Sequence, residues 1–198
     1  MDGGLLTQLW EGLKATGPWE WIANITGVIY VVLVMRHRRS GWIFGAISCL
    51  ILAVLFWNVQ LPMQAVLQLS YVAAAAYGWL KWGQAGSARP ILVWNWRGHL
   101  AMLVACVLAS LLLARVLADE SAFPFMDSLV FCLGMVATWL LARVYLENWV
   151  YWIVVDAVSV YLSWRQGLFA VVLLSILYLG IATAGFVEWL NTWRRSRA

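Results

Sequence analysis

Seven apolar runs follow one another along the chain, and this feature limits the possible fold more than any other. They cover roughly residues 19–35, 42–57, 61–81, 98–117, 127–145, 149–164 and 168–189. A helix needs about 20 apolar residues to cross the hydrocarbon core of a bilayer. The chain is 64% hydrophobic and 11% charged, which is more apolar surface than a water-soluble core of this size needs. The sequence therefore predicts an all-α integral membrane protein with seven transmembrane helices.

The sequence also contains an internal repeat. A shift of 107 residues aligns 21–82 with 128–189 without a gap. The matched pairs are Gly27 with Gly134, Arg36 with Arg143, Trp42 with Trp149, Trp57 with Trp164, Tyr71 with Tyr178, Gly78 with Gly185, and Trp82 with Trp189. Each repeat contains three apolar runs and one further run joins them, so both repeats enter the membrane from the same side. We therefore predict a 3+1+3 arrangement of parallel three-helix bundles.

This repeat divides the chain into segments whose orientation follows from their basic residues. We expect an extracellular or periplasmic segment at 1–18, a first repeat at 19–82, a cytoplasmic linker at 83–97, a linker helix with its loop at 98–126, a second repeat at 127–189 and a basic cytoplasmic tail at 190–198.

The basic residues are distributed unequally between the two sides of the membrane. One side would contain Arg36, Arg38, Arg39, Lys81, Arg89, Arg97, Arg143, Arg194, Arg195 and Arg197, and the other only Lys14, Arg115 and Arg165. Basic residues favour the cytoplasmic side, so we predict that the N-terminus lies outside and the C-terminus inside. The net charge of +4 then reflects topology and not nucleic-acid binding. Arg36, Arg38 and Arg39 are expected to matter for orientation only.

One carboxylate, Asp156, lies about eight residues inside the sixth apolar run. Such an acid costs about 2.5–3.5 kcal/mol on insertion scales and usually faces a bundle interior or a water-filled path. At helical spacing Trp149, Trp152 and Asp156 share one face, together with Ser159. We interpret Asp156 as the polar anchor of a transport cavity. The alternative is a structural role, in which Asp156 hydrogen-bonds a neighbouring helix and fixes the bundle.

A polar stripe runs along the third predicted helix, where Gln64, Gln68 and Tyr71 are spaced at i, i+4 and i+7. The second repeat keeps Tyr178 at the position of Tyr71 but has Ser175 at that of Gln68. The predicted scaffold is therefore symmetric, whereas the predicted cavity lining is not, as an asymmetric ligand would require. The alternative is that the glutamines join neighbouring helices by hydrogen bonds worth about 0.6 kcal/mol each.

Other functional classes find little support in the sequence. The two histidines, His37 and His99, lie near predicted helix ends, and paired acids, metal-ligand spacing and a nucleophile set are absent. We therefore expect no enzymatic activity, no cofactor and no metal. The cysteines Cys49, Cys106 and Cys132 lie in apolar runs and are interpreted as packing residues. A purely structural or sensory membrane protein remains the other class.

Several stretches together give the chain a family resemblance. They are GWIFGAIS at 41–48, LQLSYVAAAAYGWLKW at 67–82, AFPFMDS at 122–128 and LLARVYLENWVYWIVVDAVSV at 140–160. With them the chain resembles the PnuC family of bacterial vitamin transporters, which is similar in fold to the SWEET sugar transporters. The resemblance implies a homotrimer in the bacterial inner membrane. It also implies facilitated diffusion of nicotinamide riboside, or of another nucleoside-like or cationic vitamin, followed by phosphorylation inside the cell.

The resemblance also implies a set of substrate-binding residues. The family pattern carries over onto Gln68, Asn148, Trp149, Trp152 and Asp156. Nicotinamide riboside offers a pyridinium cation, an amide and a ribose, and a tryptophan over a desolvated cation contributes about 2 kcal/mol. The candidates for that contact are Trp42, Trp79 and Trp152, whereas Gln64, Gln68 and Asn148 suit the amide and the sugar hydroxyls. Thiamine is also an aromatic cation, so a thiamine transporter remains an alternative. A carrier coupled to protons or ions through Asp156 is a further alternative.

Overall fold

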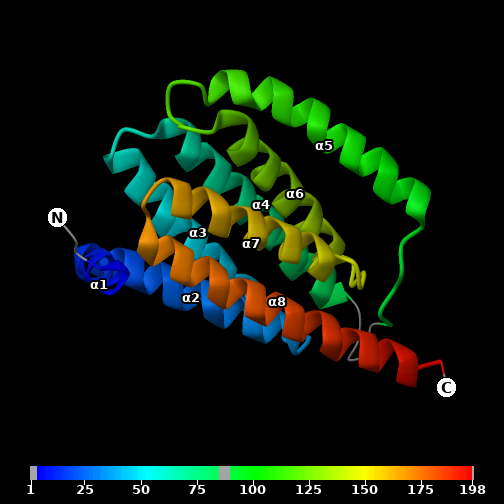
Figure 1. The fold of residues 1–198 in the computed structure, drawn as a ribbon. Helices are drawn as coiled ribbons and strands as arrows, with labels where there is room; N and C mark the ends of the chain where they lie inside the picture. Colours follow the sequence, from blue (N-terminus) through cyan, green and yellow to red (C-terminus); the bar gives the residue numbers. More distant parts are fainter. Residues whose placement is uncertain (1–3, 85–89, 198) are drawn as a thin grey trace.

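The protein is described by a computed structural model, which covers residues 4–84 and 90–197. These residues form eight helices (Figure 1): α1 (Leu5–Ala15), α2 (Pro18–Met35), α3 (Gly41–Asn58), α4 (Pro62–Gln84), α5 (Trp96–Val116), α6 (Pro124–Ala142), α7 (Asn148–Arg165) and α8 (Phe169–Arg195). Helices α2 to α8 coincide with the seven predicted apolar runs. Of these, α2, α3, α5, α6 and α8 are long and apolar enough to cross a membrane. Helices α4 and α7 are long enough but less apolar, because they contain polar side chains such as Gln68 and Asp156.

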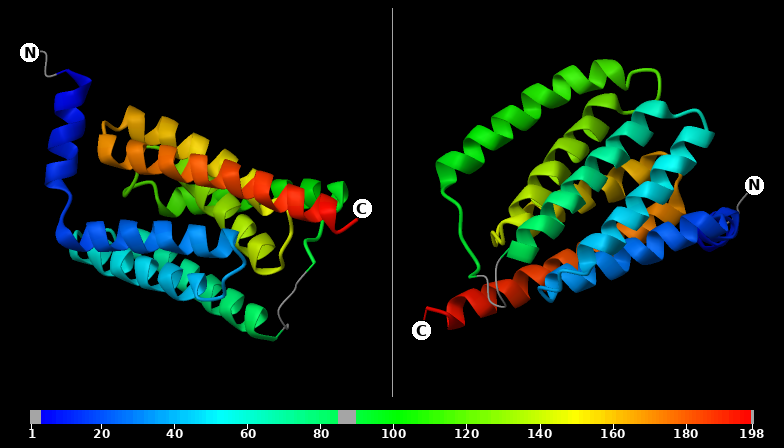
Figure 2. Two further views of the ribbon diagram at one scale, coloured as in Figure 1. Left: turned by 90° about the horizontal axis from the view of Figure 1, so that it is seen from below. Right: turned by 180° about the vertical axis from the view of Figure 1, so that it is seen from behind.

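Six helices form a closed ring. Contacts run in the order α2, α3, α4, α6, α7, α8 and back to α2, and α5 lies outside this ring against α6 (Figures 1 and 2). We call α2–α4 the first half and α6–α8 the second half. The two halves meet along two interfaces, one between α4 and α6 and the other between α2 and α8. Each interface therefore joins the third helix of one half to the first helix of the other.

Four helices of the ring end in the same local structure. The Schellman motif at the ends of α2, α3, α6 and α7 places a residue in the left-handed region, namely His37 (φ 56°), Gln60 (φ 63°), Val144 (φ 61°) and Gly167 (φ 72°). In each motif two N–H groups donate to carbonyls of the last helical turn at 2.8–3.2 Å. His37 corresponds to Val144, and Gln60 to Gly167, at the same shift of 107 residues. Matched helices thus end with matching backbone geometry.

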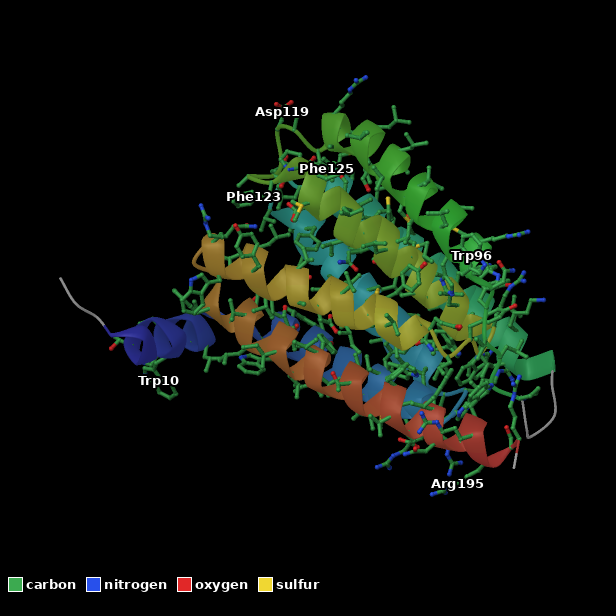
Figure 3. All side chains as sticks on the ribbon, turned by 45° about the vertical axis from the view of Figure 1, so that its right-hand side comes forward. Trp10, Trp96, Asp119, Phe123, Phe125 and Arg195 are labelled. Atoms are coloured by element: carbon green, nitrogen blue, oxygen red, sulfur yellow. The ribbon has the colours of Figure 1, made fainter. Side chains whose placement is uncertain are left out.

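The basic residues gather at one end of the molecule, which we call the basic end. There α2, α4, α6 and α8 finish and α3, α5 and α7 begin. Figure 3 shows Trp96 and Arg195 at this end, and Trp10 and Asp119 at the opposite end. Of the predicted linker 83–97, residues 85–89, and Arg89 among them, lie outside the described residues. After this gap Leu92 forms a parallel bridge with Tyr145, so the linker is held against the loop between α6 and α7.

Helix α1 was not predicted, because its 11 residues are too few to cross a bilayer. It lies at a steep angle to the ring helices (Figure 2) and contacts α8, where Gly12 faces Ala170 near the start of that helix. The predicted N-terminal segment 1–18 therefore contains a helix at the end opposite to the basic end.

Candidate substrate-binding cavity

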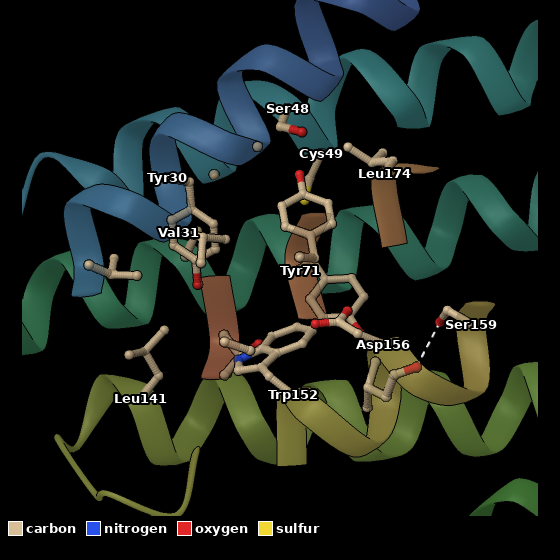
Figure 4. A pocket seen from close by; sticks show the side chains of 18 of the residues that line it. Tyr30, Val31, Ser48, Cys49, Tyr71, Leu141, Trp152, Asp156, Ser159 and Leu174 are labelled. Atoms are coloured by element: carbon tan, nitrogen blue, oxygen red, sulfur yellow. Dashed lines mark hydrogen bonds between the residues drawn. The ribbon is translucent and has the colours of Figure 1, made fainter. Parts of the chain in front are cut away.

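A cavity of about 310 Å³ lies inside the helix ring, and all six ring helices contribute to its lining (Figure 4). The predicted site residues that line it are Trp42, Gln68, Tyr71, Trp149, Trp152, Asp156 and Tyr178. They come from α3, α4, α7 and α8. The structure therefore brings together residues that lie more than a hundred positions apart in the sequence.

Helix α7 presents the most polar face of the cavity. Trp149, Trp152, Asp156 and Ser159 recur at three- and four-residue intervals, so their side chains point to one side of the helix, and all four line the cavity. Asp156 is only 8% exposed. Among the described residues it is the only acidic side chain of the lining, and no lysine, arginine or histidine lines the cavity. A charged Asp156 would therefore have no cationic protein partner in the described lining, and the cavity suits a ligand that supplies the positive charge.

Two tryptophans line the cavity from the first turns of α3 and α7, near the basic end. Trp42 and Trp149 are each 1% exposed, and their indole N–H groups have no hydrogen-bond partner among the described residues. Each ring packs on a helical glycine of its own half, Trp42 on Gly78 and Trp149 on Gly185. A Cβ atom at Gly185 would lie 2.8 Å from ring atoms of Trp149, so the glycine is needed for this close approach. We call Trp42 and Trp149 the aromatic floor.

The cavity also contains residues that the sequence analysis did not assign to it. These are chiefly Tyr30, Ser48, Cys49 and Ser175. Cys49 was interpreted as a packing residue, but its thiol lines the cavity opposite α7 (Figure 4). The repeat contained a signal for it, because Cys49 occupies the position of Asp156 in the first half. Tyr30 had no such signal, since its counterpart in the second half is Ala137.

Three predicted site residues do not line the cavity. Trp79 lies outside it, and its ring stacks on the guanidinium of Arg39, whose Cζ is 3.7 Å from the ring centroid. Arg39 also donates from Nε to the carbonyl of Trp79 at 2.9 Å. Arg39 therefore also packs on α4, and this face of Trp79 already holds a cation of the protein itself. That Arg39 matters for orientation only stays a prediction.

Asn148 and Gln64 also lie beyond the lining. Asn148 is completely buried at the first position of α7, where its Nδ2 donates to the carbonyl of Tyr145 at 2.7 Å. Its side chain therefore ties the start of α7 to the preceding loop. Gln64 lies one turn before Gln68, near the start of α4. That Asn148 and Gln64 bind the substrate directly stays a prediction.

Comparison with known proteins supplies the family. The sequence model of the nicotinamide mononucleotide transporter family matches residues 17–191. The chain belongs to this family. It is similar to the nicotinamide riboside transporter PnuC of Escherichia coli, with 28% identity over 88% of this chain and 86% of the relative. It is also similar to the riboflavin/roseoflavin transporter RibM of Streptomyces davaonensis, with 27% identity over 90% of this chain and 85% of the relative.

A solved structure shares the fold. The crystal structure of the vitamin B3 transporter PnuC superposes with a TM-score of 0.74, at 24% identity, over 96% of this chain and 90% of the other. The predicted resemblance to the PnuC family is thus confirmed, as is an all-helical membrane protein. The related proteins are transporters of vitamin-type small molecules.

Proposed function

We propose that this protein imports nicotinamide riboside across the bacterial inner membrane through the central cavity. Movement is by facilitated diffusion, and phosphorylation inside the cell traps the substrate and maintains the inward gradient. The observation that best supports this proposal is the single carboxylate, Asp156, beside the aromatic ring of Trp152 in a cavity without a basic side chain among the described residues. The pyridinium ring of the riboside is both flat and positively charged, so it complements both groups.

The same charge distribution favours the riboside over the mononucleotide. A phosphate inside a low-dielectric cavity needs cationic or hydrogen-bonding partners, and the described lining offers the carboxyl group of Asp156 but no lysine, arginine or histidine. Repulsion between two anions would add to the cost of removing the phosphate from water. The phosphorylated product is therefore expected to bind poorly and to stay inside the cell.

Neutral polar groups are available for the rest of the ligand. Gln68 offers both a donor and an acceptor, and Tyr71, Ser175 and Tyr178 offer hydroxyls, all from the cavity lining. We assign Gln68 to the carboxamide or the ribose. Asn148 acts indirectly, because it fixes the start of the helix that holds Trp149, Trp152 and Asp156.

The architecture that we propose has seven membrane spans in a 3+1+3 repeat like that of SWEET transporters, with α4 and α7 as the two less apolar spans. Their position in the ring between apolar helices supports this count. The basic end is assigned to the cytoplasm because basic residues are retained there. We also propose a homotrimer. The apolar outward face of α5, with Leu100, Leu108 and Leu112 exposed, is available for lipid or for a second copy.

Calorimetric titration of the detergent-purified protein with nicotinamide riboside, nicotinamide mononucleotide, thiamine and riboflavin tests the substrate. We expect micromolar binding of the riboside, and binding of the mononucleotide that is weaker by at least about tenfold. Binding of thiamine alone would keep the site but assign the protein to thiamine uptake, which is our second candidate because thiamine is also an aromatic cation. Binding of riboflavin alone would contradict the role given to the charge of Asp156.

Coupling is tested separately in proteoliposomes that contain no kinase. Facilitated diffusion predicts that counterflow of labelled riboside is unchanged when the membrane potential or the pH gradient is dissipated. Loss of uptake on dissipation would instead support a proton- or ion-coupled carrier, in which Asp156 takes up the ion.

A further inference from the structure

Two tryptophans connect the halves of the molecule at the basic end. Trp82 of α4 donates from Nε1 to the carbonyl of Ala142 at the end of α6, at 3.1 Å. Trp189 of α8 donates from Nε1 to the carbonyl of Met35 at the end of α2, at 2.8 Å. The two bonds are related by the shift of 107 residues, and one lies on each interface between the halves.

The acceptors are carbonyls that their own helices leave free. A Schellman motif satisfies the carbonyls three and two residues before the cap, but not that of the last helical residue. In α2 the N–H groups after the helix bond Leu33 and Val34, and Met35 is left for Trp189. The equivalent motif of α6 leaves Ala142 for Trp82. Each half therefore donates an indole hydrogen bond to the free carbonyl at a helix end of the other half.

These indoles also support the aromatic floor. Trp82 contacts Trp42 edge to face with ring centroids 5.5 Å apart, and Trp189 contacts Trp149 in the same way at 5.5 Å. Trp189 is fully buried and Trp82 is buried. Trp42 and Trp149 line the cavity from the first turns of α3 and α7, so separating the halves here would move the floor and break both indole hydrogen bonds.

A second level of contacts lies nearer the middle of the same helices. The hydroxyl of Tyr71 approaches Gly134 of α6, and that of Tyr178 approaches Gly27 of α2. These pairs again join α4 to α6 and α8 to α2. Each tyrosine precedes the tryptophan of the same helix by eleven residues, about three helical turns, so this level of contacts is separate from the indole hydrogen bonds at the basic end.

We propose that Trp82 and Trp189 are gate residues for transport: their two hydrogen bonds hold the cavity shut toward the basic end, and both must break before substrate passes there. The gate is not fully symmetric. His37 stacks on Trp189 with ring centroids 4.5 Å apart and lies 6.2 Å from Trp82, whereas Val144 occupies the equivalent position in the second half. The proposal rests on the cavity being the substrate path.

Cys49 provides a native reporter for the test, because its thiol lines the cavity. In a background with Cys106→Ala and Cys132→Ala, Cys49 is labelled with a membrane-impermeant methanethiosulfonate in oriented vesicles, from each face in turn. Trp82→Phe and Trp189→Phe retain an aromatic ring but lose the donor. Loss of one hydrogen bond of typical net strength should raise the labelling rate from the face at the basic end about fivefold in each single variant. Loss of both bonds should raise it about 25-fold in the double variant.

Trp164→Phe is the matched control, since Trp164 is an exposed tryptophan of α7 and its replacement should leave labelling unchanged. If a Phe variant does not fold, 3-benzothienylalanine at the same position retains the shape of the indole without its N–H. Unchanged labelling from the basic-end face in folded variants, or an increase only from the opposite face, would overturn the gate. Protection of Cys49 by nicotinamide riboside, measured without the tryptophan substitutions, separates the two proposals. Absence of protection would contradict the substrate path, whereas unchanged labelling rates in the Phe variants would contradict closure by the two tryptophans alone.

Discussion

The two halves of the ring share their packing residues and differ in their cavity residues. Trp42, Gly78 and Trp82 of the first half recur as Trp149, Gly185 and Trp189 of the second, and the recurring residues make equivalent contacts. In the lining, by contrast, Asp156 of the second half corresponds to Cys49 of the first half. Most of these contacts lie within one half, whereas Trp82 and Trp189 each also donate a hydrogen bond to the other half.

In the proposed function, this difference lets a symmetric scaffold bind an asymmetric ligand. A buried tryptophan packed on a glycine fixes the distance between two helices, so a change there affects the whole half. A side chain that points into a cavity has fewer packing neighbours and can differ without moving a helix. The comparison predicts that substitutions in matched scaffold positions affect stability equally, whereas substitutions in matched cavity positions affect binding unequally.

The largest effect is expected at the glycines beneath the aromatic floor. Gly78→Ala and Gly185→Ala would each push a methyl group into a buried indole and should lower the free energy of unfolding by about 2–3 kcal/mol. Thermal unfolding in detergent measures this effect. Gly180→Ala on the same helix as Gly185 is the control, because nothing lies within 4 Å of its added Cβ. Equal stability of the Gly180 and Gly185 variants would contradict the role of the close approach.

The next effect concerns the charge in the cavity. Asp156→Asn retains the shape of the side chain but removes its charge, so affinity for nicotinamide riboside should fall by about tenfold to a hundredfold, with the protein still folded. Cys49→Ser at the matched position should change affinity by less than about threefold. Calorimetric titration of both variants checks the difference. Equal losses would mean that the halves contribute alike to the site.

A smaller difference is expected between Gln68 and its counterpart Ser175, which both line the cavity. Gln68→Ala removes a donor and an acceptor and should weaken riboside binding about tenfold, whereas Ser175→Ala removes one hydroxyl and should weaken it about threefold or less. The measurement is again titration of purified protein. A larger loss at Ser175 would place the polar part of the ligand against α8 instead of α4.

The smallest effect concerns the matched turns after α3 and α7. Gln60 adopts φ 63° and Gly167 φ 72°, a region that costs a residue with a side chain about 1–2 kcal/mol. Gln60→Gly should therefore raise the free energy of unfolding by up to about 1 kcal/mol, and Gly167→Ala should lower it by about 1 kcal/mol. Thermal unfolding of the pair is the test. Shifts of the same sign would indicate that the two turns are not equivalent.

Much of the fold could be predicted because apolar runs and tryptophan positions are local properties of the sequence. The seven long helices begin within three residues of the predicted runs and, except for α8, end within three residues of them; α8 continues to Arg195, six residues beyond its run. Helix α1 was missed because hydropathy detects spans and not short helices. In the cavity, Trp152 and Asp156 were found from their spacing on one helix, but Tyr30 belongs to a different helix and had no counterpart to reveal it.

The sequence by itself determined which segments are helical, how they repeat and that one acid lies in an apolar helix, because these follow from hydropathy and periodicity along the chain. Only the tertiary structure decided which side chains meet. It placed Cys49 in the cavity and Trp79 outside it, against Arg39. It also paired Trp82 with Ala142 and Trp189 with Met35. Such contacts depend on how helices distant in sequence are oriented about their own axes, and this rotation is set by packing across the interfaces between the halves.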